Sequence, residues 1–355
     1  MPRPIHASFD AAALRHNHEL ARRRAGGALL WSVVKANAYG HGLARVAHVL
    51  REVTDGFALI EIDAAIALRR AGVRQPILLL EGCYSADELP TVAELGLTPV
   101  VHSLAQAWAL VDARLPARVP VYLKLDTGMH RLGLDARELE QALALIEPCA
   151  GPITLMSHFA DADGKSGVAV QLAAFEAMRG GRPFPACLAN SAALLRFPQT
   201  RGDWVRPGIM LYGSSPFPEL TADALELRPV MTLASELIAV RDIGRGDTVG
   251  YGGTFTADGP MRIGVVACGY ADGYPRHAPT GTPILVGGRR TRTLGRVSMD
   301  KLCVDLTGLA EAGVGSPVTL WGAGLSVDEV AAAAGTISYE LFCALAARVP
   351  VVELE

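Results

Sequence analysis

The chain has 355 residues, 50% of them hydrophobic, with 37 glycines, 22 prolines and a formal net charge of −3. This length can bury a large core, and we expect one large domain with a smaller one beside it. The charge gives no electrostatic reason to expect a nucleic-acid partner, and the arginine clusters at 22–24 and 289–292 are interpreted as solvated faces.

The sequence also argues against a membrane protein and against a metalloprotein. The run Met1–His6 lacks the apolar core of a secretory signal, and no apolar run reaches the roughly 18 residues of a membrane helix. We therefore expect a cytoplasmic protein. His16 and His18 alternate within an expected helix and do not share a face, so we expect no metal. The cysteines form no Cys-x-x-Cys pair, which favours reduced thiols; they are Cys83, Cys149, Cys187, Cys268, Cys303 and Cys343.

From Leu29 to Gly213, short β-rich runs alternate with amphipathic helical stretches, as in βα units around a parallel sheet. Eight strands are expected: Leu30–Val34, Gly56–Ile60, Ile77–Glu81, Pro99–His102, Val121–Asp126, Ile153–His158, Ala186–Asn190 and Val205–Leu211. Helices are expected over His41–Val53, Ile62–Ala71, Asp135–Ile146 and Val168–Met178. The fold class predicted is α/β, with an N-terminal (β/α)8 TIM-type barrel at residues 10–225 whose first helix is capped by Asp10.

A doubly wound sheet is the competing fold. Gly40-His41-Gly42 follows the first strand as part of a dinucleotide fingerprint would, but Arg45 stands where the third glycine belongs. Eight units also exceed what one mononucleotide-binding half requires, which favours the barrel.

After about Leu225 the pattern becomes antiparallel, which predicts a smaller, mainly β C-terminal domain at residues 226–355. Its expected strands are Met231–Val240, Ile263–Cys268, Pro283–Val286, Leu302–Leu306 and Val318–Trp321, and its expected helices are Val327–Ala334, capped by Ser326, and Tyr339–Ala347. The run Ile5–Phe9 precedes the first barrel helix, and residues 1–9 are placed with the β domain.

Lys35 is the most informative single residue. The chain has only four lysines among many arginines, and Lys35 ends an apolar β-run. Arginine cannot lose its proton in a protein, whereas a desolvated lysine amine can, and it can then form a Schiff base with a carbonyl. A lysine that merely snorkels at a strand end is the alternative.

In a barrel, chemistry occurs at the carboxyl ends of the strands. The expected ends are unusually polar: Lys35, Lys124, Asp126, Arg131, His158, Asn190, Ser191 and Arg206. The loops after the last two strands commonly hold a phosphate, and Ser191, Gly208 and Ile209 lie there. A phosphorylated aldehyde would join Lys35 to Ser191, and pyridoxal 5′-phosphate is such a cofactor.

The chain resembles the alanine racemase family of barrel-type pyridoxal-phosphate enzymes. The segments that carry this resemblance run from the first strand to the C-terminal domain; they are 34–42, 124–133, Asn190-Ser191, 206–213, Gly250-Tyr251-Gly252, 269–273 and 295–300. They lie in order over nearly the whole chain.

The resemblance implies a homodimer with shared active sites, in which Lys35 carries the cofactor and Tyr251 of the partner subunit is the second acid/base. It places Tyr39, Asn190, Ser191, Gly208, Ile209 and Tyr339 around the cofactor and its phosphate. It puts Arg206 at the pyridine nitrogen with His158 stacked near the ring, Arg131 and the Met299 N–H at the substrate carboxylate, and Tyr270, Arg296 and Asp300 at the entrance. Lys124 matches a lysine that can be carbamylated.

The implied reaction interconverts L- and D-alanine, either to supply D-alanine for peptidoglycan or to break it down. Racemisation needs one base on each face of the substrate's planar Cα, which suits Lys35 and Tyr251. An arginine at the pyridine nitrogen leaves the ring a weaker electron sink than an aspartate would.

Two departures from the family concern local detail. Cys187 stands where relatives often have a histidine in contact with the arginine at the pyridine nitrogen, so we expect the tuning of Arg206 to differ. The C-terminus, residues 348–355, lacks the final arginine and tyrosine common in the family.

Three rival functions remain at this stage. A basic amino-acid decarboxylase on the same fold would pair the pyridine nitrogen with a carboxylate, and Arg206 and Tyr251 argue against it. A non-enzymatic pyridoxal-phosphate carrier would be a lone barrel, whereas this chain adds a long β domain. A nucleotide-binding barrel would be colourless when purified.

Overall fold

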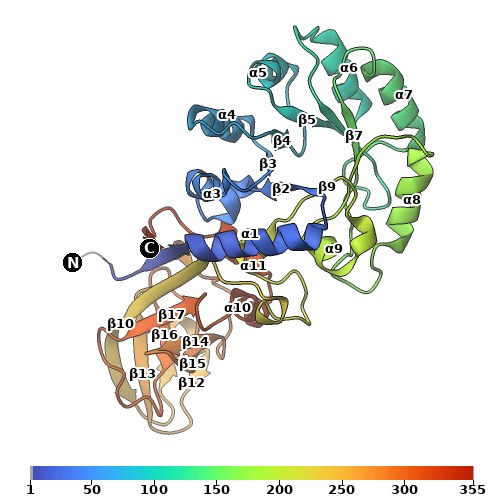
Figure 1. Cartoon of the computed structure of the whole chain (residues 1–355). Coiled ribbons are helices and arrows are strands. Elements are labelled where there is room, and N and C mark those ends of the chain that lie inside the picture. Colours follow the sequence, from blue (N-terminus) through green and yellow to red (C-terminus); the bar gives the residue numbers. More distant parts are fainter. Residues whose placement is uncertain (1–2, 355) are drawn as a thin grey trace.

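The structure, a computed structural model, describes residues 3–354. Eight parallel strands close into a barrel in the order β2 to β9, and a second, mainly β part lies beside it (Figure 1). The predicted fold class is therefore confirmed, and the doubly wound alternative is wrong. The division at residues 225 and 226 stays a prediction.

The barrel strands are short and buried on both faces. They are β2 (Leu29–Val33), β3 (Gly56–Leu59), β4 (Ile77–Leu79), β5 (Thr98–Val101), β6 (Val121–Lys124), β7 (Ile153–Met156), β8 (Ala186–Cys187) and β9 (Trp204–Val205). The barrel closes where β2 pairs with β9, and there Trp31 stacks on Trp204 at 4.3 Å between ring centroids. Gly56 makes room for this pair, because a Cβ there would lie 2.3 Å from the Trp31 ring.

Helices cover the outside of the barrel strands, which accounts for the nearly continuous apolar sequence of those strands. They are α1 (Ala11–Ala25), α3 (Leu43–Leu50), α4 (Ile62–Arg70), α5 (Leu89–Glu94), α6 (Leu104–Asp112), α7 (Ala136–Ile146), α8 (Ala169–Arg179) and α9 (Ser191–Arg196). The predicted cap is confirmed, since the Asp10 carboxylate accepts the Ala13 N–H at 2.8 Å. Asp135 and Glu138 form a capping box at α7.

The last two barrel strands were predicted too long. After β8 the Asn190 side chain accepts the N–H of Ala193 at 2.9 Å and starts α9, which takes the chain out of the sheet. After β9, residues Ile209–Tyr212 form a 3₁₀ turn, η3. The residues expected at these two strand ends therefore lie in loops at the barrel mouth.

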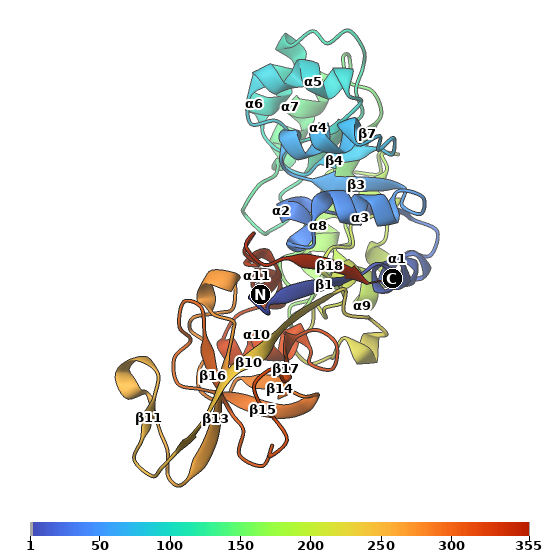
Figure 2. The same ribbon diagram turned by 90° about the vertical axis from the view of Figure 1, so that its left-hand side faces the viewer.

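The second part is built on an eight-stranded sheet in the order β13-β16-β15-β14-β17-β10-β1-β18. The strands are β1 (His6–Asp10), β10 (Met231–Ile243), β13 (Met261–Val266), β14 (Pro283–Val286), β15 (Arg289–Leu294), β16 (Leu302–Asp305), β17 (Pro317–Trp321) and β18 (Val351–Leu354), with a separate hairpin of β11 (Thr248–Val249) and β12 (Phe255–Thr256). β1 pairs with β10 and, in parallel, with β18, so the N-terminal strand belongs to this sheet (Figure 2).

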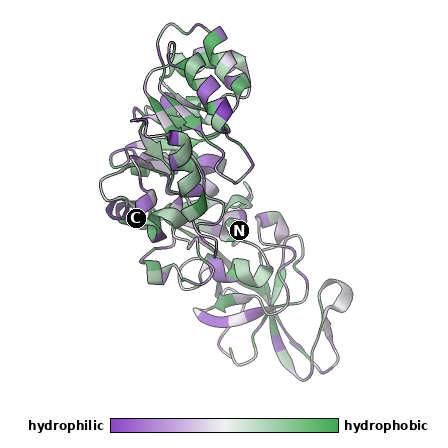
Figure 3. Ribbon diagram, turned by 90° about the vertical axis from the view of Figure 1, so that its right-hand side faces the viewer, coloured by the Kyte–Doolittle hydropathy of each residue, from purple (hydrophilic) through white to green (hydrophobic). Residues whose placement is uncertain are grey.

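Two helices lie between the sheet and the barrel: α10 (Val327–Ala334), capped by Ser326 as predicted, and α11 (Ser338–Cys343). α11 is shorter than the predicted Tyr339–Ala347, because the Ala346 N–H donates to the Asp272 carbonyl at 3.2 Å instead of continuing the helix. Hydrophilic segments are spread over both parts of the chain (Figure 3). No helix among residues 3–354 has both the length and the apolarity that crossing a membrane requires.

The junction between the two parts allows a matched test of backbone packing. Gly213 and Gly308 share a φ of +80°, but a Cβ at Gly213 would lie 1.8 Å from the Arg228 carbonyl oxygen, whereas one at Gly308 would meet nothing within 4 Å. We expect Gly308→Ala to lower the free energy of unfolding by about 1–2 kcal/mol, the left-handed backbone cost alone, and Gly213→Ala to lower it much further. Denaturant unfolding at equal protein concentration measures both. Equal losses would contradict the clash.

Candidate active site

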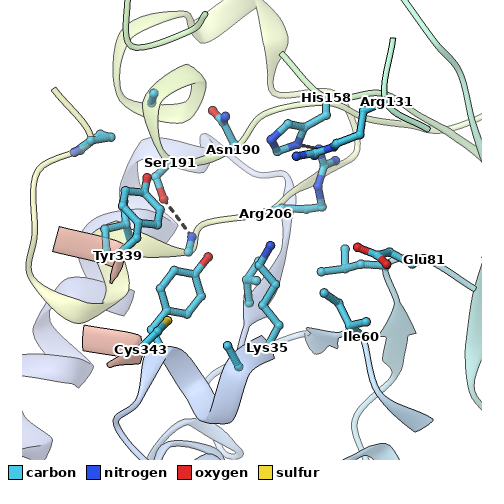
Figure 4. Close-up of a pocket in the computed structure, with 18 of the residues that line it drawn as sticks. Lys35, Ile60, Glu81, Arg131, His158, Asn190, Ser191, Arg206, Tyr339 and Cys343 are labelled. Carbon is cyan, nitrogen blue, oxygen red and sulfur yellow. Dashed lines mark hydrogen bonds between the residues drawn. The ribbon is translucent and has the colours of Figure 1, made fainter. Parts of the chain in front are cut away.

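A cavity of about 390 Å³ opens at the carboxyl ends of the barrel strands. It brings together most of the predicted site residues (Figure 4): Lys35, Tyr39, Lys124, Arg131, His158, Asn190, Ser191, Arg206, Gly208, Ile209 and Tyr339. These residues come from the segments at the carboxyl ends of β2, β6 and β7, from the loops around α9 and η3, and from the C-terminal α11. The residues that were expected at the carboxyl ends of different strands therefore line a single cavity.

Lys35 leaves β2 through a left-handed turn, α2 (Lys35–Tyr39). Residues 36–39 have φ values of 51°, 54°, 54° and 51°, a conformation that costs roughly 1–2 kcal/mol per non-glycine residue. Asn37 tolerates it best and stabilises it, since its Oδ1 accepts the Leu43 N–H at 2.8 Å. The turn brings both Lys35 and Tyr39 to the wall of the cavity, which explains why this strain is retained.

Burial and nearby cations lower the pKa of both lysines in the cavity, Lys35 and Lys124. Burial, and then Arg131, lower the pKa of the Lys35 amine, although Glu81 opposes them. Burial, Arg206 and Arg131 lower the pKa of Lys124 to about 8, and its side chain is only 6% exposed. The neutral amine is therefore favoured at both positions relative to an exposed lysine.

Arg206 is buried and held almost entirely by uncharged acceptors. Its guanidinium donates to the carbonyls of Ser157 at 2.7 Å, Cys187 at 2.6 Å and Leu188 at 3.0 Å. It also donates to the Cys187 sulfur at 3.0 Å. Burial raises the pKa of that thiol, so Arg206 keeps its positive charge beside a neutral sulfur.

His158 packs beside Arg206 at the same end of the cavity (Figure 4). Its Nδ1 lies 3.4 Å from Arg206 Nη2, and because a guanidinium only donates, Nδ1 accepts and the imidazole proton is on Nε2. Burial, followed by Arg206 and Lys124, holds the pKa of His158 well below its usual value. The ring is thus a neutral, flat surface.

The opposite end of the cavity offers hydroxyl donors. The Ser191 Oγ accepts the N–H groups of Gly208 at 2.9 Å and Met210 at 3.4 Å, which leaves its own proton free to donate. Tyr39 stacks on Tyr212 at 4.7 Å, and burial raises its pKa, so its phenol stays a donor. Tyr339 of α11 lies on the same side (Figure 4). This donor set fits a phosphate.

Arg131 is presented by an ordered loop after β6. The Asp126 carboxylate, predicted as a polar strand end, accepts the N–H groups of Gly128 and His130, each at 3.0 Å, and thereby folds the loop. Gly133, at φ +141°, lets the loop return to the strand, since a Cβ there would lie 2.5 Å from the Asp126 nitrogen. Asp126 therefore supports the loop and does not line the cavity.

Five predicted residues lie in the second part of the chain, outside this cavity: Tyr251, Tyr270, Arg296, Met299 and Asp300. Tyr251 begins the short 3₁₀ turn η5 (Tyr251–Gly253) and is 71% exposed, and Met299 is 53% exposed. Arg296 lies against the Tyr251 turn, because a Cβ at Gly252 would be 3.3 Å from Arg296 Nη1. A single chain leaves these groups on its surface.

Three titratable cavity residues were missed: Glu81, Asp163 and Cys343. Glu81 ends the third predicted strand, so the strand-end rule could have found it. Cys343 lies four residues after Tyr339 on α11, hence on the same helix face. Asp163 lies in an irregular loop with no such signal.

Among residues 3–354, no group of three or more His, Cys, Asp or Glu side chains is arranged to hold a metal, and all six cysteines are free thiols.

Comparison with known proteins decides the family. Residues 9–216 match the family model "Alanine racemase, N-terminal domain" and residues 230–353 match "Alanine racemase, C-terminal domain". The chain belongs to the alanine racemase family. It is 54% identical to the alanine racemase of Nitrosospira multiformis, over 98% of this chain and 99% of that protein, and 57% identical to that of Thiobacillus denitrificans, over 99% and 96%.

Solved structures agree with the sequence relatives. The biosynthetic alanine racemase of Pseudomonas aeruginosa superimposes with a TM-score of 0.97 at 48% identity, covering 99% of this chain and all of the other. The alanine racemase of Acinetobacter baumannii gives 0.93 at 36%, over 99% and 100%. The predicted resemblance is confirmed, and with it the dependence of the family on pyridoxal phosphate.

The fit of the cavity to that cofactor can be tested at Gly208. A Cβ at Gly208 would lie 2.5 Å from the Tyr39 Oη and 3.3 Å from its Cζ. We expect Gly208→Ala to weaken pyridoxal-phosphate binding about tenfold or more, because overpacking costs about 1–3 kcal/mol. Adding Tyr39→Phe removes the clashing oxygen. The double variant should therefore lose less cofactor-binding free energy than the sum of the losses in the two single variants. Titrating the apoenzyme with cofactor measures all four proteins, and strictly additive losses would reject this packing.

Proposed function

We propose that the protein interconverts L- and D-alanine at this cavity, with Lys35 on one face of the substrate and Tyr251 of the partner subunit on the other. The observation that carries the proposal is the Lys35 amine, which projects between the hydroxyl donors of Ser191 and Tyr339 and the Arg206–His158 pair (Figure 4). When bound, pyridoxal phosphate withdraws electrons from the substrate's Cα–H bond and makes that proton removable.

Lys35 serves as a base through the neutral form of its amine. Burial and Arg131 lower its pKa, so removing a proton costs less than from an exposed lysine. Ser191, Tyr39, Tyr339 and the backbone at Gly208 and Ile209 hold the phosphate. Asn190 acts at this end mainly through α9, whose first turn it caps and whose first residue is Ser191.

Arg206 and His158 hold the ring end of the cofactor. The guanidinium cannot give up its proton to the pyridine nitrogen, and the neutral imidazole offers a flat stacking surface. Arg131 and the Met299 N–H bind the substrate carboxylate. Because an arginine leaves the pyridine nitrogen unprotonated, it favours return of the proton to Cα, hence racemisation over decarboxylation or transamination.

The homodimer with shared sites is proposed because Tyr251, the second base that the family resemblance implies, lies outside the chain's own cavity and is exposed. Tyr251, Tyr270 and Met299 are among the exposed large hydrophobic residues, at 71%, 36% and 53%. Exposed apolar side chains gathered near each other favour a protein interface. Tyr270, Arg296 and Asp300 would then line the entrance to the partner's cavity. The cytoplasm remains the proposed compartment, in keeping with six free thiols.

Complementation between two inactive variants tests the two bases and the shared site together. Lys35→Ala and Tyr251→Phe homodimers should each lose at least about a hundredfold in rate, the contribution of one positioned base. A mixed dimer of the two has one site with both bases intact, so statistical mixing should restore about a quarter of wild-type activity. Chiral chromatography of products from L-alanine measures this. Full activity of either parent, or mixtures that stay inactive although subunits exchange, would reject the proposal.

Lys124 is the proposed carbamylation site. Its pKa of about 8 leaves a fraction of neutral amine, which adds carbon dioxide to form an N–C bond and releases one proton. The product carries a negative charge beside Arg131 and Arg206, where the ammonium was repelled.

Isotopically labelled bicarbonate tests this modification. We expect a carbamate carbon resonance in the wild type that is absent from Lys124→Arg, and weaker labelling below pH 7 because the amine is then protonated. The matched control is Lys165→Arg, an exposed lysine whose replacement should change nothing. A wild-type spectrum identical to that of Lys124→Arg would exclude the carbamate.

A further inference from the structure

Four charged residues from four separate segments meet at the loops that carry Tyr270 and Met299. Asp272, in the 3₁₀ turn η6 (Tyr270–Asp272), is fully buried and accepts two hydrogen bonds from Arg3, at 2.7 and 2.8 Å, and one from Arg348 at 2.8 Å. Arg348 also donates to the Asp300 carboxylate at 2.7 Å, and Arg3 donates to the Asp300 carbonyl at 3.1 Å. We call Arg3, Asp272, Asp300 and Arg348 the arginine clamp.

Backbone hydrogen bonds join the two loops that the clamp grips. Tyr270 donates to the Ser298 carbonyl and Ala271 donates to the Met299 carbonyl, both at 3.0 Å. The contact is close, because a Cβ at Gly269 would lie 2.3 Å from the Ser298 oxygen. The backbone around Met299 therefore follows the position of Asp272.

The clamp differs from a surface ion pair because its central carboxylate, Asp272, is buried. Burial raises the pKa of Asp272, but hydrogen bonds from Arg3, from the Gly269 N–H and from Arg348 outweigh it and bring the net pKa below its usual value. The carboxylate is thus buried and charged. Removing either arginine leaves that charge under-compensated, so the loops must shift to solvate it. Ion pairs between two exposed groups have no such consequence.

We propose that the arginine clamp positions Tyr270 and the Met299 N–H for the active site of the partner subunit. Arg3, Asp272 and Arg348 touch neither cofactor nor substrate and act as positioning residues. This inference rests on the proposed function, in which Met299 serves the partner's cavity. An N–H that binds the substrate carboxylate must be positioned accurately, because a misplacement of about 1 Å can lower the rate about a hundredfold.

Arg3→Met and Arg348→Met test the clamp singly, because each leaves Asp272 with one arginine and keeps the chain folded. We expect kcat/KM for alanine to fall between about tenfold and about a hundredfold, mainly through KM, since carboxylate binding is affected. Arg290→Met is the matched control. It removes the Arg290–Glu329 pair, in which both side chains are exposed and which lies in the same part of the chain, and it should change kcat/KM by less than about twofold.

Mixed dimers separate positioning of the partner's site from general destabilisation. In one hybrid, Arg348→Met is on the chain that also carries Lys35→Ala, so the one working barrel receives altered loops. In the other, Arg348→Met is on the chain with the intact Lys35, so the working barrel receives normal loops from its partner. We expect the raised KM only in the first hybrid. A raised KM in both or only in the second, or a normal KM in both, overturns the inference.

The same two mixed dimers, made with Tyr251→Phe in place of Arg348→Met, distinguish failure of the clamp inference from failure of the shared active site. Loss of activity only when Tyr251→Phe is on the Lys35→Ala chain supports shared sites. If that pattern holds while the Arg348→Met hybrids do not differ, the clamp inference alone is wrong. If the Tyr251→Phe hybrids do not differ either, the shared site itself is wrong.

Discussion

The crowding of cationic side chains at one end of the barrel is the constraint on which the rest of the site depends. Lys35, Lys124, Arg131 and Arg206 line the same cavity, opposed by only two lining carboxylates, Glu81 and Asp163. Burial first, and then repulsion by arginines that cannot release a proton, lowers the pKa of both lysines. The same charges attract an anion. One arrangement therefore lowers the pKa of the lysine amines and favours an anionic ligand in the cavity.

Arg206 shows how the fold fixes a functional group without an ion pair. Its guanidinium is held by carbonyls at the ends of β7 and β8, so backbone geometry sets its position. The side chain at position 187 adds only a weak sulfur contact, and burial keeps that thiol neutral. The Cys187 thiol thus contributes one weak contact, while the three carbonyls set the orientation of Arg206, and the expected difference in the tuning of Arg206 stays a prediction.

Local rules predicted those parts of the structure in which sequence neighbours decide the outcome. The sequence predicted the eight-strand barrel, the Asp10 and Ser326 caps and the cationic strand ends, because hydrophobic periodicity and helix capping depend on residues close together in the chain. The left-handed turn after Lys35 was not, since residues 36–39 contain no glycine and local preference opposes it. β18 and the length of α11 were also missed, because they depend on contacts with β1 and with the Asp272 turn, far away in sequence. Asp163 and Cys343 entered the site through such long-range packing.

The position of the second base follows from the geometry of a barrel mouth. Every strand end approaches a ligand from the same side, so a barrel supplies groups around and beneath a flat adduct more easily than above it. A base on the opposite face must come from another element that reaches over the opening. In the proposed homodimer that element is the turn bearing Tyr251, which lies beside Arg296 and outside its own cavity. Under that proposal each Tyr251 turn would cover the barrel of the other subunit, and two-fold symmetry would complete both sites at once. The accuracy of each proposed site would then depend on how rigidly the second part of the chain holds its exposed loops, and so on the buried Asp272 carboxylate.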